Sequence, residues 1–597
     1  MKKDNINVKR MTIGELLSNN FLVPGYQRPY EWKSEQIKSL LVGICEAKKV
    51  SNADIYLLGT MQFTEKIIKE KTVLEIIDGH QRITTLFLML MALDDEKKEK
   101  DEENRDFTFK NEINGAENFE SLFAKESIYQ TNLNYIRDYL NDIECDEKKE
   151  LISYIKNQLI IIDITIKDSE EANEVSIEDT LSIFNTLNTT GLKLQAKDIF
   201  KIKFAEYLKK KNPDIFSGGL FKSINEAYQK ILDPIDSPNA NEIYDLSEDD
   251  LLDSYRFYLM SNLNLKKWAN DFKKTNVMFF DELFQKDSNV NIDLDDFCKL
   301  AECIKQTQCC LEKRDNSVVE KDKVVFAYSK ELLAWSGYSR IKNLYYYVIF
   351  SVFSEKVDEQ IINFADRVIN SVWRYCSVFR FVKSQIINEV FNTVGEILFG
   401  ILKTESSYEE KAISIEKEFQ KSIEQKISDN DNYFVLFQTA FSPNGNAFES
   451  NRIHLLMFLS YIHDTIDLED PPCIVETKGK IAYWKNKGID IEHILSRSLY
   501  NENDDVFQSI NAIGNLMYLS RKQNRWLGDR LAKNKDRDKK QDFSLKVSTY
   551  QDCQNELASV KAFVKEYSNN FDFIKERNRE KIQFLKDVYN YEVLFKE

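Results

Sequence analysis

The order of apolar and polar positions divides the chain into three parts. In residues 1 to about 210, short apolar runs at 54–63, 72–77 and 159–166 are typical of strands. The run 83–93 is apolar on nearly every face, which predicts a buried helix. Strands and helices that alternate in this way predict an N-terminal α/β domain.

The middle of the chain, from about 215 to 435, has long helical patterns. Examples lie at 344–353, 361–381 and 385–402. Because this part carries no recognisable catalytic motif, we expect a helical scaffold that couples the two ends of the chain.

The third part follows a polar stretch at 428–432. Alternating positions at 489–492 and a β-rich run within 511–520 predict two strands, and 523–533 predicts a helix. The fold class we expect is therefore α+β and predominantly helical, with domains at 1–210, 211–430 and 431–597.

Composition and charge indicate a folded cytoplasmic protein. The 597 residues include only 8 prolines and 17 glycines, and the nine cysteines form no CxxC pair. The sequence has neither a long apolar run nor the apolar core of a leader peptide, so we expect no membrane partner. The formal charge of −16 repels DNA, so any contact with nucleic acid has to come from local basic surface.

The most informative chemical pattern lies near the C-terminus. Glu492 precedes His493, one of only four histidines, and Asn515 and Asn524 follow on the predicted second strand and helix. In a one-metal nuclease, a histidine takes a proton from water while carboxylate and amide oxygens hold Mg²⁺ against the phosphate. This pattern therefore predicts a nuclease that uses Mg²⁺ or another divalent metal.

The same pattern resembles the HNH endonucleases, and more closely the DUF1524 type, in three motifs: Glu492-His493-Ile494, Gly514-Asn515-Leu516 and Asn524. The resemblance implies a ββα-metal fold with His493 as general base. It also implies Glu492 and Asn524 as metal ligands, beside Asp490, and Asn515 as the residue that orients the loop or His493 itself.

A basic segment at 519–540 follows the second strand. In an acidic chain, this local excess of Lys and Arg is typical of a face that contacts phosphates. The nucleic-acid-binding residues that we expect there are Arg521, Lys522, Arg525, Arg530 and Lys533. The other histidines of this part, His454 and His463, lie in an apolar helical pattern and are expected in the core or on the helix surface.

Four short motifs lie in the N-terminal part, at 23–32, 58–62, 77–85 and 184–201. The third predicts a strand, a tight turn at Gly79 and a helix start, where backbone N–H groups and the helix dipole favour phosphate. At that junction Asp78 could hold Mg²⁺, and Arg82 offers a bidentate donor. The remaining candidates in these motifs are Arg28, Tyr30, His80, Gln81, Thr84, Asn188 and Lys193.

These four motifs resemble the DUF262 domain, which has a ParB/sulfiredoxin-like fold. The family's signature is DGQQR, and this chain has Asp78-Gly79-His80-Gln81-Arg82, so His80 replaces the first glutamine. The resemblance implies binding and hydrolysis of a nucleoside triphosphate, with Asp78, Gln81 and Arg82 as catalytic residues.

The two resemblances in one chain are the layout of the GmrSD family of modification-dependent restriction enzymes. They imply an NTP-regulated endonuclease that cuts modified phage DNA in bacterial defence. Two alternatives stay open: a ParB-like DNA-binding regulator with an inactive HNH domain, and an RNA-targeting abortive-infection nuclease. With one active site per chain, a double-strand break needs two chains or two events, which makes a homodimer a further expectation.

Overall fold

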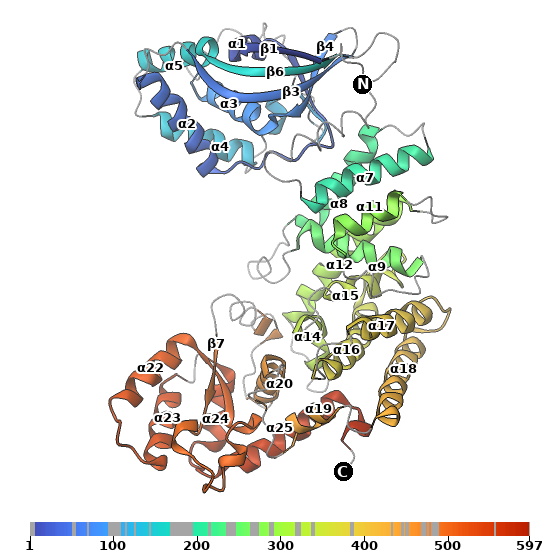
Figure 1. Cartoon of the computed structure of the whole chain (residues 1–597), viewed down its shortest axis with the longest axis vertical. Coiled ribbons are helices and arrows are strands. Elements are labelled where there is room, and N and C mark those ends of the chain that lie inside the picture. Colours follow the sequence, from blue (N-terminus) through green and yellow to red (C-terminus); the bar gives the residue numbers. More distant parts are fainter. Residues whose placement is uncertain are drawn as a thin grey trace. The chain divides into compact units, whose positions relative to one another are not determined.

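The computed structural model of the chain is mostly helical and has one larger and one smaller β-sheet (Figure 1). This confirms the predominantly helical α+β class. The chain forms two compact units: Met1–Tyr228 with Asn276–Cys298, and Gln229–Thr275 with Lys299–Glu597. The predicted domain boundaries near 210 and 430 stay predictions. The structure describes residues 6–50, 55–68, 71–93, 109–113, 116, 118–123, 127–141, 145–167, 195–212, 217–233, 246–262, 274–285, 292–316, 324–335, 341–381, 387–430, 434–442, 447, 453–466, 468, 473–474, 477–478, 489–553 and 557–595.

The first unit is built on a six-stranded mixed sheet with strand order β1-β6-β3-β4-β2-β5. The predicted strands are confirmed and somewhat longer than the patterns that predicted them. The strands are β1 (Ile6–Thr12), β2 (Asn20–Val23), β3 (Tyr56–Ile68), β4 (Lys71–Asp78), β5 (Phe109–Asn111) and β6 (Leu159–Lys167).

Helices of the first unit cover one side of this sheet (Figure 1). The predicted buried helix is α3 (His80–Leu93), whose side chains Ile83, Leu86 and Met89 are fully buried. Around it lie α1 (Ile13–Leu17), α2 (Ser34–Val50), α4 (Ile128–Leu140) and α5 (Cys145–Gln158). The unit also contains α7 (Ala196–Lys211), α11 (Asn276–Gln285) and most of α8 (Ser217–Leu232).

The second unit has a helical core centred on α16 (Glu359–Phe381), in which Trp373 is fully buried. The predicted helical patterns are confirmed as α15 (Leu344–Phe350), α16 and α17 (Ile387–Leu402). Further helices are α9 (Glu248–Asn262), most of α12 (Leu294–Asp315), α13 (Val324–Ala327), α14 (Ser329–Trp335), α18 (Tyr408–Asp429) and α19 (Val435–Ala440).

The C-terminal part of this unit has the strand–strand–helix order that the sequence predicts. Strands β7 (Ile489–His493) and β8 (Leu516–Ser520) are antiparallel, and α22 (Arg521–Ala532) follows β8 directly. Around them lie α20 (Ile453–Ile466), α23 (Lys539–Cys553), α24 (Ala558–Tyr567) and α25 (Phe573–Tyr589). In the described part of the chain, none of the helices combines the length and the hydropathy needed to cross a membrane.

Candidate nuclease and nucleotide sites

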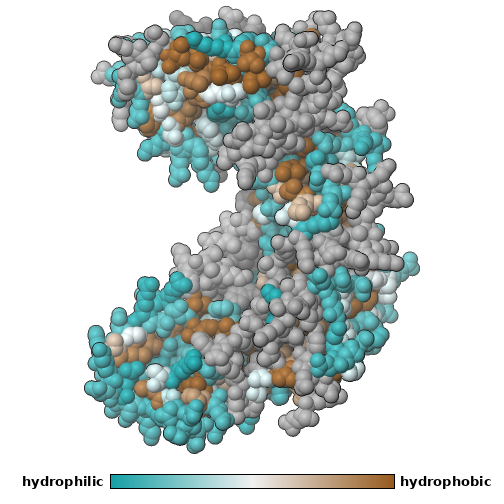
Figure 2. Space-filling view, viewed as in Figure 1, coloured by the Kyte–Doolittle hydropathy of each residue, from teal (hydrophilic) through white to brown (hydrophobic). Residues whose placement is uncertain are grey.

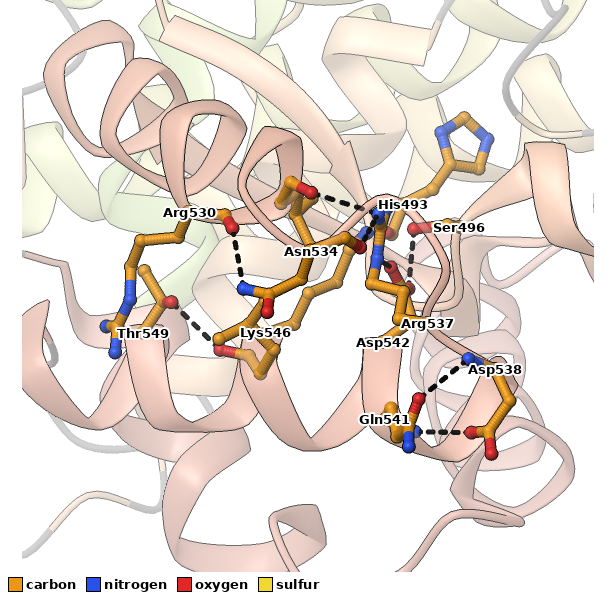
Figure 3. A network of polar contacts seen from close by, with 12 residues as sticks. His493, Ser496, Arg530, Asn534, Arg537, Asp538, Gln541, Asp542, Lys546 and Thr549 are labelled. Atoms are coloured by element: carbon orange, nitrogen blue, oxygen red, sulfur yellow. Dashed lines mark hydrogen bonds and ion pairs between the residues drawn. The ribbon is translucent and has the colours of Figure 1, made fainter.

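The β7–β8 ladder ends at His493, which pairs with Leu516. Successive side chains on a strand point to opposite faces, so Asp490 and Glu492 share one face of β7 while His493 faces the other way. Figure 3 shows the His493 ring pointing away from Lys546 and Asp542. The histidine and the preceding carboxylate therefore meet different neighbours.

His493 is oriented by an amide that the motif did not include. Its Nε2 lies 3.0 Å from Asn511 Oδ1. An imidazole that donates its Nε2 proton to this oxygen keeps its lone pair on Nδ1, as a general base requires. Burial lowers the pKa of His493, and the bond to Asn511 opposes that shift, so the ring is neutral at pH 7.

Asn515 holds the loop after His493 through hydrogen bonds to its backbone. It is fully buried, its Oδ1 accepts from Leu495 N at 2.7 Å, and its Nδ2 donates to Leu495 O and Ile510 O. The backbone adds a bond from Ile494 N to Asn515 O at 2.9 Å. Of the two roles that the resemblance implied, this geometry favours orientation of the loop.

Asp490 and Asn524 lie together, as expected of shared metal ligands. Helix α22 begins at the N-cap Ser520, which forms a capping box with Gln523. The next residue, Asn524, donates from Nδ2 to Asp490 Oδ2 at 2.8 Å. The side chain of Asp490 is 35% exposed, with Arg521 Nε 3.8 Å away.

Glu492, in contrast, is paired with a buried amine. Lys546 Nζ contacts both Glu492 Oε1 and the carbonyl oxygen of His493, and the side chain of Lys546 is 3% exposed. Tyr550 adds a longer hydrogen bond to the same carboxylate oxygen at 3.5 Å.

Lys546 belongs to a row of polar residues on α23 that supports the loop after β7. Asp542, Lys546 and Tyr550 are spaced four residues apart and so lie on one helix face. Asp542 accepts from Ser496 Oγ at 2.6 Å and also pairs with Arg537 (Figure 3). Sequence reasoning missed this row, because polar residues at helical spacing are usually exposed and only the structure shows that these are buried.

Four of the predicted DNA-binding residues lie on α22, and Lys533 is its C-cap residue. Arg521, Lys522, Arg525 and Lys533 are exposed, and the less exposed Arg530 pairs with Asp552 at 2.8 Å. The remaining histidines of this part lie on α20, where His454 is exposed and His463 packs against Phe584 with 5.0 Å between ring centroids.

In the first unit, the second and third N-terminal motifs lie side by side. Gly79 has a φ of 103°, which permits the turn between β4 and α3. Arg82 NH2 then donates to Thr60 O at 2.8 Å and to Asp78 Oδ2 at 3.1 Å. Gly59, with φ of 121°, gives this guanidinium room, because a Cβ there would lie 2.7 Å from Arg82 NH1.

The first motif, at 23–32, is hydrogen-bonded to the start of α3. Gln81 Nε2 donates to Pro29 O at 2.8 Å, while its Oε1 accepts from Glu31 N at 2.9 Å. His80 Nδ1 lies 3.1 Å from Arg28 O, and Tyr30 OH lies 2.8 Å from the hydroxyl of Thr85. Burial lowers the pKa of His80 to about 4, so Nδ1–H donates and the ring stays neutral at pH 7.

The described end of the fourth motif reaches the same loop. Arg28 Nε pairs with Asp198 Oδ2 at 2.8 Å, and Lys201 Nζ donates to Gln27 O at 3.0 Å. Burial lowers the pKa of Lys201 to about 8. Asn188 and Lys193 lie outside the described residues.

The predicted nucleotide residues differ in exposure. The side chains of Asp78, Arg82 and Arg28 are 44%, 25% and 19% exposed, and these groups can meet a ligand. Tyr30, His80 and Thr84 are almost fully buried. In this structure they lie in the interior next to the turn at Gly79, and their contact with nucleotide stays a prediction.

Two family matches agree with these two sites. Residues 13–205 match the GmrSD restriction endonuclease N-terminal domain, and residues 437–583 match the C-terminal domain of GmrSD restriction endonucleases. Together the two matches cover more than half of the chain. The chain belongs to the GmrSD restriction endonucleases. It is therefore a nuclease whose substrate is DNA, with a role in restriction and defence. No curated protein matches the chain significantly.

Within the matched C-terminal domain, α25 holds the Gly514-Asn515-Leu516 turn from behind. Arg577 NH1 donates to Gly514 O at 2.6 Å and to Leu516 O at 3.0 Å. Gly514 N donates to Asn578 Oδ1 at 3.1 Å. The sequence of α25 has no motif that predicts these contacts.

Proposed function

We propose that this GmrSD endonuclease is an NTP-regulated enzyme that cuts modified phage DNA by a one-metal HNH mechanism. The observation that carries the nuclease part is the His493–Asn511 bond at the end of the strand on which Asp490 meets Asn524. The first contact orients an imidazole at the end of β7, and the second pairs Asn524 with Asp490, whose side chain leaves the opposite face of the same strand.

In the proposed reaction, His493 Nδ1 takes the proton from the attacking water, and Asn511 holds the ring for this step. The Lys and Arg side chains of α22 hold the DNA backbone. When bound, a divalent cation supplies charge stabilisation for the phosphate and its leaving oxygen.

The residues present fit such a cation. Mg²⁺ prefers carboxylate and amide oxygens and commonly uses one or two carboxylates together with water and phosphate. Asp490 and Asn524 offer one carboxylate and one amide side chain in contact with each other, although among the described residues no group of three His, Cys, Asp or Glu side chains could hold a metal. Because Lys546 already balances the charge of Glu492, Asp490 and Asn524 are the better ligands.

Replacement of each carboxylate separately tests this ligand choice. We expect Asp490→Asn to weaken binding of Mn²⁺, measured by electron paramagnetic resonance without DNA, more than Glu492→Gln does. If Glu492→Gln alone abolishes Mn²⁺ binding, then Glu492 is the principal ligand, as the motif implied.

Cleavage by His493→Ala tests the catalytic assignment, with His454→Ala as the control because His454 is an exposed histidine outside the site. We expect His493→Ala to bind DNA and to lose cleavage, while His454→Ala cleaves normally. A panel of modified and unmodified phage DNAs, host DNA and tRNA, with and without each NTP, identifies the substrate. Cleavage of DNA by His493→Ala, or cleavage of tRNA alone by the wild type, would contradict the proposal.

The nucleotide part of the proposal rests on the turn from Asp78 to Arg82. The start of α3 presents backbone N–H groups next to the Arg82 guanidinium, which suits a phosphate. We expect Asp78→Asn to lose NTP turnover and Asp138→Asn, an exposed aspartate on α4, to keep it. Unchanged turnover in Asp78→Asn places the hydrolytic site elsewhere.

A further inference from the structure

Helix α22 exposes a tryptophan. Trp526 is 41% exposed, and it is the only aromatic residue among the large hydrophobic side chains that the described part of the chain exposes. In residues 489–553 and 557–595 it is also the only large hydrophobic side chain that is exposed. Single exposed apolar residues are common, so its surroundings decide whether it has a role.

Trp526 lies in the middle of a basic row. Lys522 precedes it by four residues and Arg530 follows by four, so these three side chains share one face of α22, and the C-cap Lys533 continues the row seven residues after Trp526. The Arg530 guanidinium lies over the indole ring, 5.2 Å from its centroid, and Asp552 holds that guanidinium at 2.8 Å. None of the ion pairs among the described residues involves Lys522 or Lys533.

We propose that Trp526 is a stacking platform for a DNA base that has left the double helix. The ring offers a flat aromatic surface, its arginine partner is already fixed, and the neighbouring lysines are placed to hold the backbone on either side of the base. A protein partner would need further exposed apolar side chains around the ring, and the described residues of this region provide none. The proposal rests on DNA being the substrate of the nuclease site.

The position of Trp526 indicates which base it binds. Asn524 contacts the site from the same helix, but two residues correspond to more than half a turn, so the two side chains leave α22 on different sides. The stacked base therefore belongs to a nucleotide that flanks the cut, and the scissile phosphate lies on the Asn524 side of the helix.

Binding to a single-stranded oligodeoxynucleotide and to a duplex of the same sequence tests this role. The full chain carries His493→Ala so that cleavage does not interfere. Trp526→Phe keeps an aromatic ring, Trp526→Ala removes it, and Val435→Ala is the control because Val435 has a similar exposure of 42% on α19. Thermal unfolding of all variants checks that they fold.

We expect Trp526→Ala to weaken binding of the single strand by about 5- to 150-fold, the range for the loss of one base–aromatic stack. Trp526→Phe should retain most of the affinity, and Val435→Ala all of it. The fluorescence of 2-aminopurine placed beside the cut should be quenched by the parent protein and not by Trp526→Ala.

Equal affinity and equal quenching in Trp526→Ala and Val435→Ala would overturn the proposal. The same holds if Trp526→Phe loses as much affinity as Trp526→Ala. A stacking role predicts that the phenyl ring retains most of the affinity, whereas alanine does not. Cleavage by the His493→Ala parent would instead contradict the general-base assignment, and the binding measurements would still test the stacking role.

Discussion

Replacement of Arg577 tests how the catalytic turn is supported. The side chain is 2% exposed and makes two hydrogen bonds to the carbonyls of Gly514 and Leu516, besides a contact of 3.2 Å with Asp464. Arg577→Met keeps much of the length and apolar volume of the side chain but removes its donors. Two buried carbonyl oxygens then lose a charged partner.

The size of the effect follows from these contacts. A hydrogen bond from a charged group contributes about 1.5–3 kcal/mol, so the two bonds together stabilise by about 3–6 kcal/mol. In Arg577→Met, Asp464 still pairs with Lys581. The charged form of Lys581 is then more stable, because the neighbouring positive charge of Arg577 has been removed. Burial, and then the charge of Arg577, lower the pKa of Lys581 to about 7. This relief offsets part of the loss, and we expect a net destabilisation of about 3 kcal/mol, near the lower limit for breaking a buried ion pair.

Urea unfolding followed by circular dichroism measures this difference. Arg579→Met is the matched control, since Arg579 is exposed on the same helix, and it should change the free energy of unfolding by less than about 0.5 kcal/mol. Because the turn positions His493, Arg577→Met should also lower kcat for DNA cleavage and leave DNA binding unchanged. Equal unfolding midpoints for the two variants would refute the assigned role of Arg577.

Three further predictions concern other parts of the two sites. Gly514→Ala should destabilise the protein by about 1–3 kcal/mol, because its Cβ would lie 2.6 Å from a backbone nitrogen of α25. Gly528→Ala is the control: it has open space around it and should stabilise the protein by up to about 1 kcal/mol. Thermal unfolding measures both differences. His80 has a pKa of about 4 in the folded protein, below its ordinary value of 6.5. Its contribution to the free energy of unfolding is therefore complete above pH 6.5 and is lost as the pH falls to 4. In denaturant titrations over this range, His80→Gln should remove about 3 kcal/mol of the pH dependence. Asn511→Ala should lower kcat and move the acid limb of the pH–rate profile to lower pH, because the bond to Asn511 raises the pKa of His493, and Asn511→Asp should move it the other way.

The sequence predicted those parts of the nuclease region that depend on local patterns. The alternating positions predicted β7, the β-rich run predicted β8, and the helical pattern at 523–533 predicted α22, which has Asn524 near its start. Each of these elements is set by residues within a few positions of one another, through side-chain alternation, strand propensity or the capping box of Ser520 and Gln523. The resemblance assigned Asn524 and Asp490 to one metal site, and the hydrogen bond between them is a finding of the structure.

The residues that hold the catalytic side chains in place could not be predicted in this way. Asn511, Lys546 and Arg577 reach their partners across 18, 53 and 63 positions of the sequence. Such pairs are selected by the packing of helices against the hairpin, and one sequence gives no local signal for that packing. The pairing of Glu492 with Lys546 is the most consequential example, because our proposal of Asp490 as the metal ligand rests on it.

These long-range contacts also show that the nuclease is larger than its strand–strand–helix core. Residues 489–532 alone would leave the carbonyls of Gly514 and Leu516 without the donors that Arg577 supplies. Toward the other end of the same helix, Tyr589 OH accepts from Ser377 Oγ of α16 at 2.9 Å. Helix α25 therefore links the catalytic turn to the helical core of its unit.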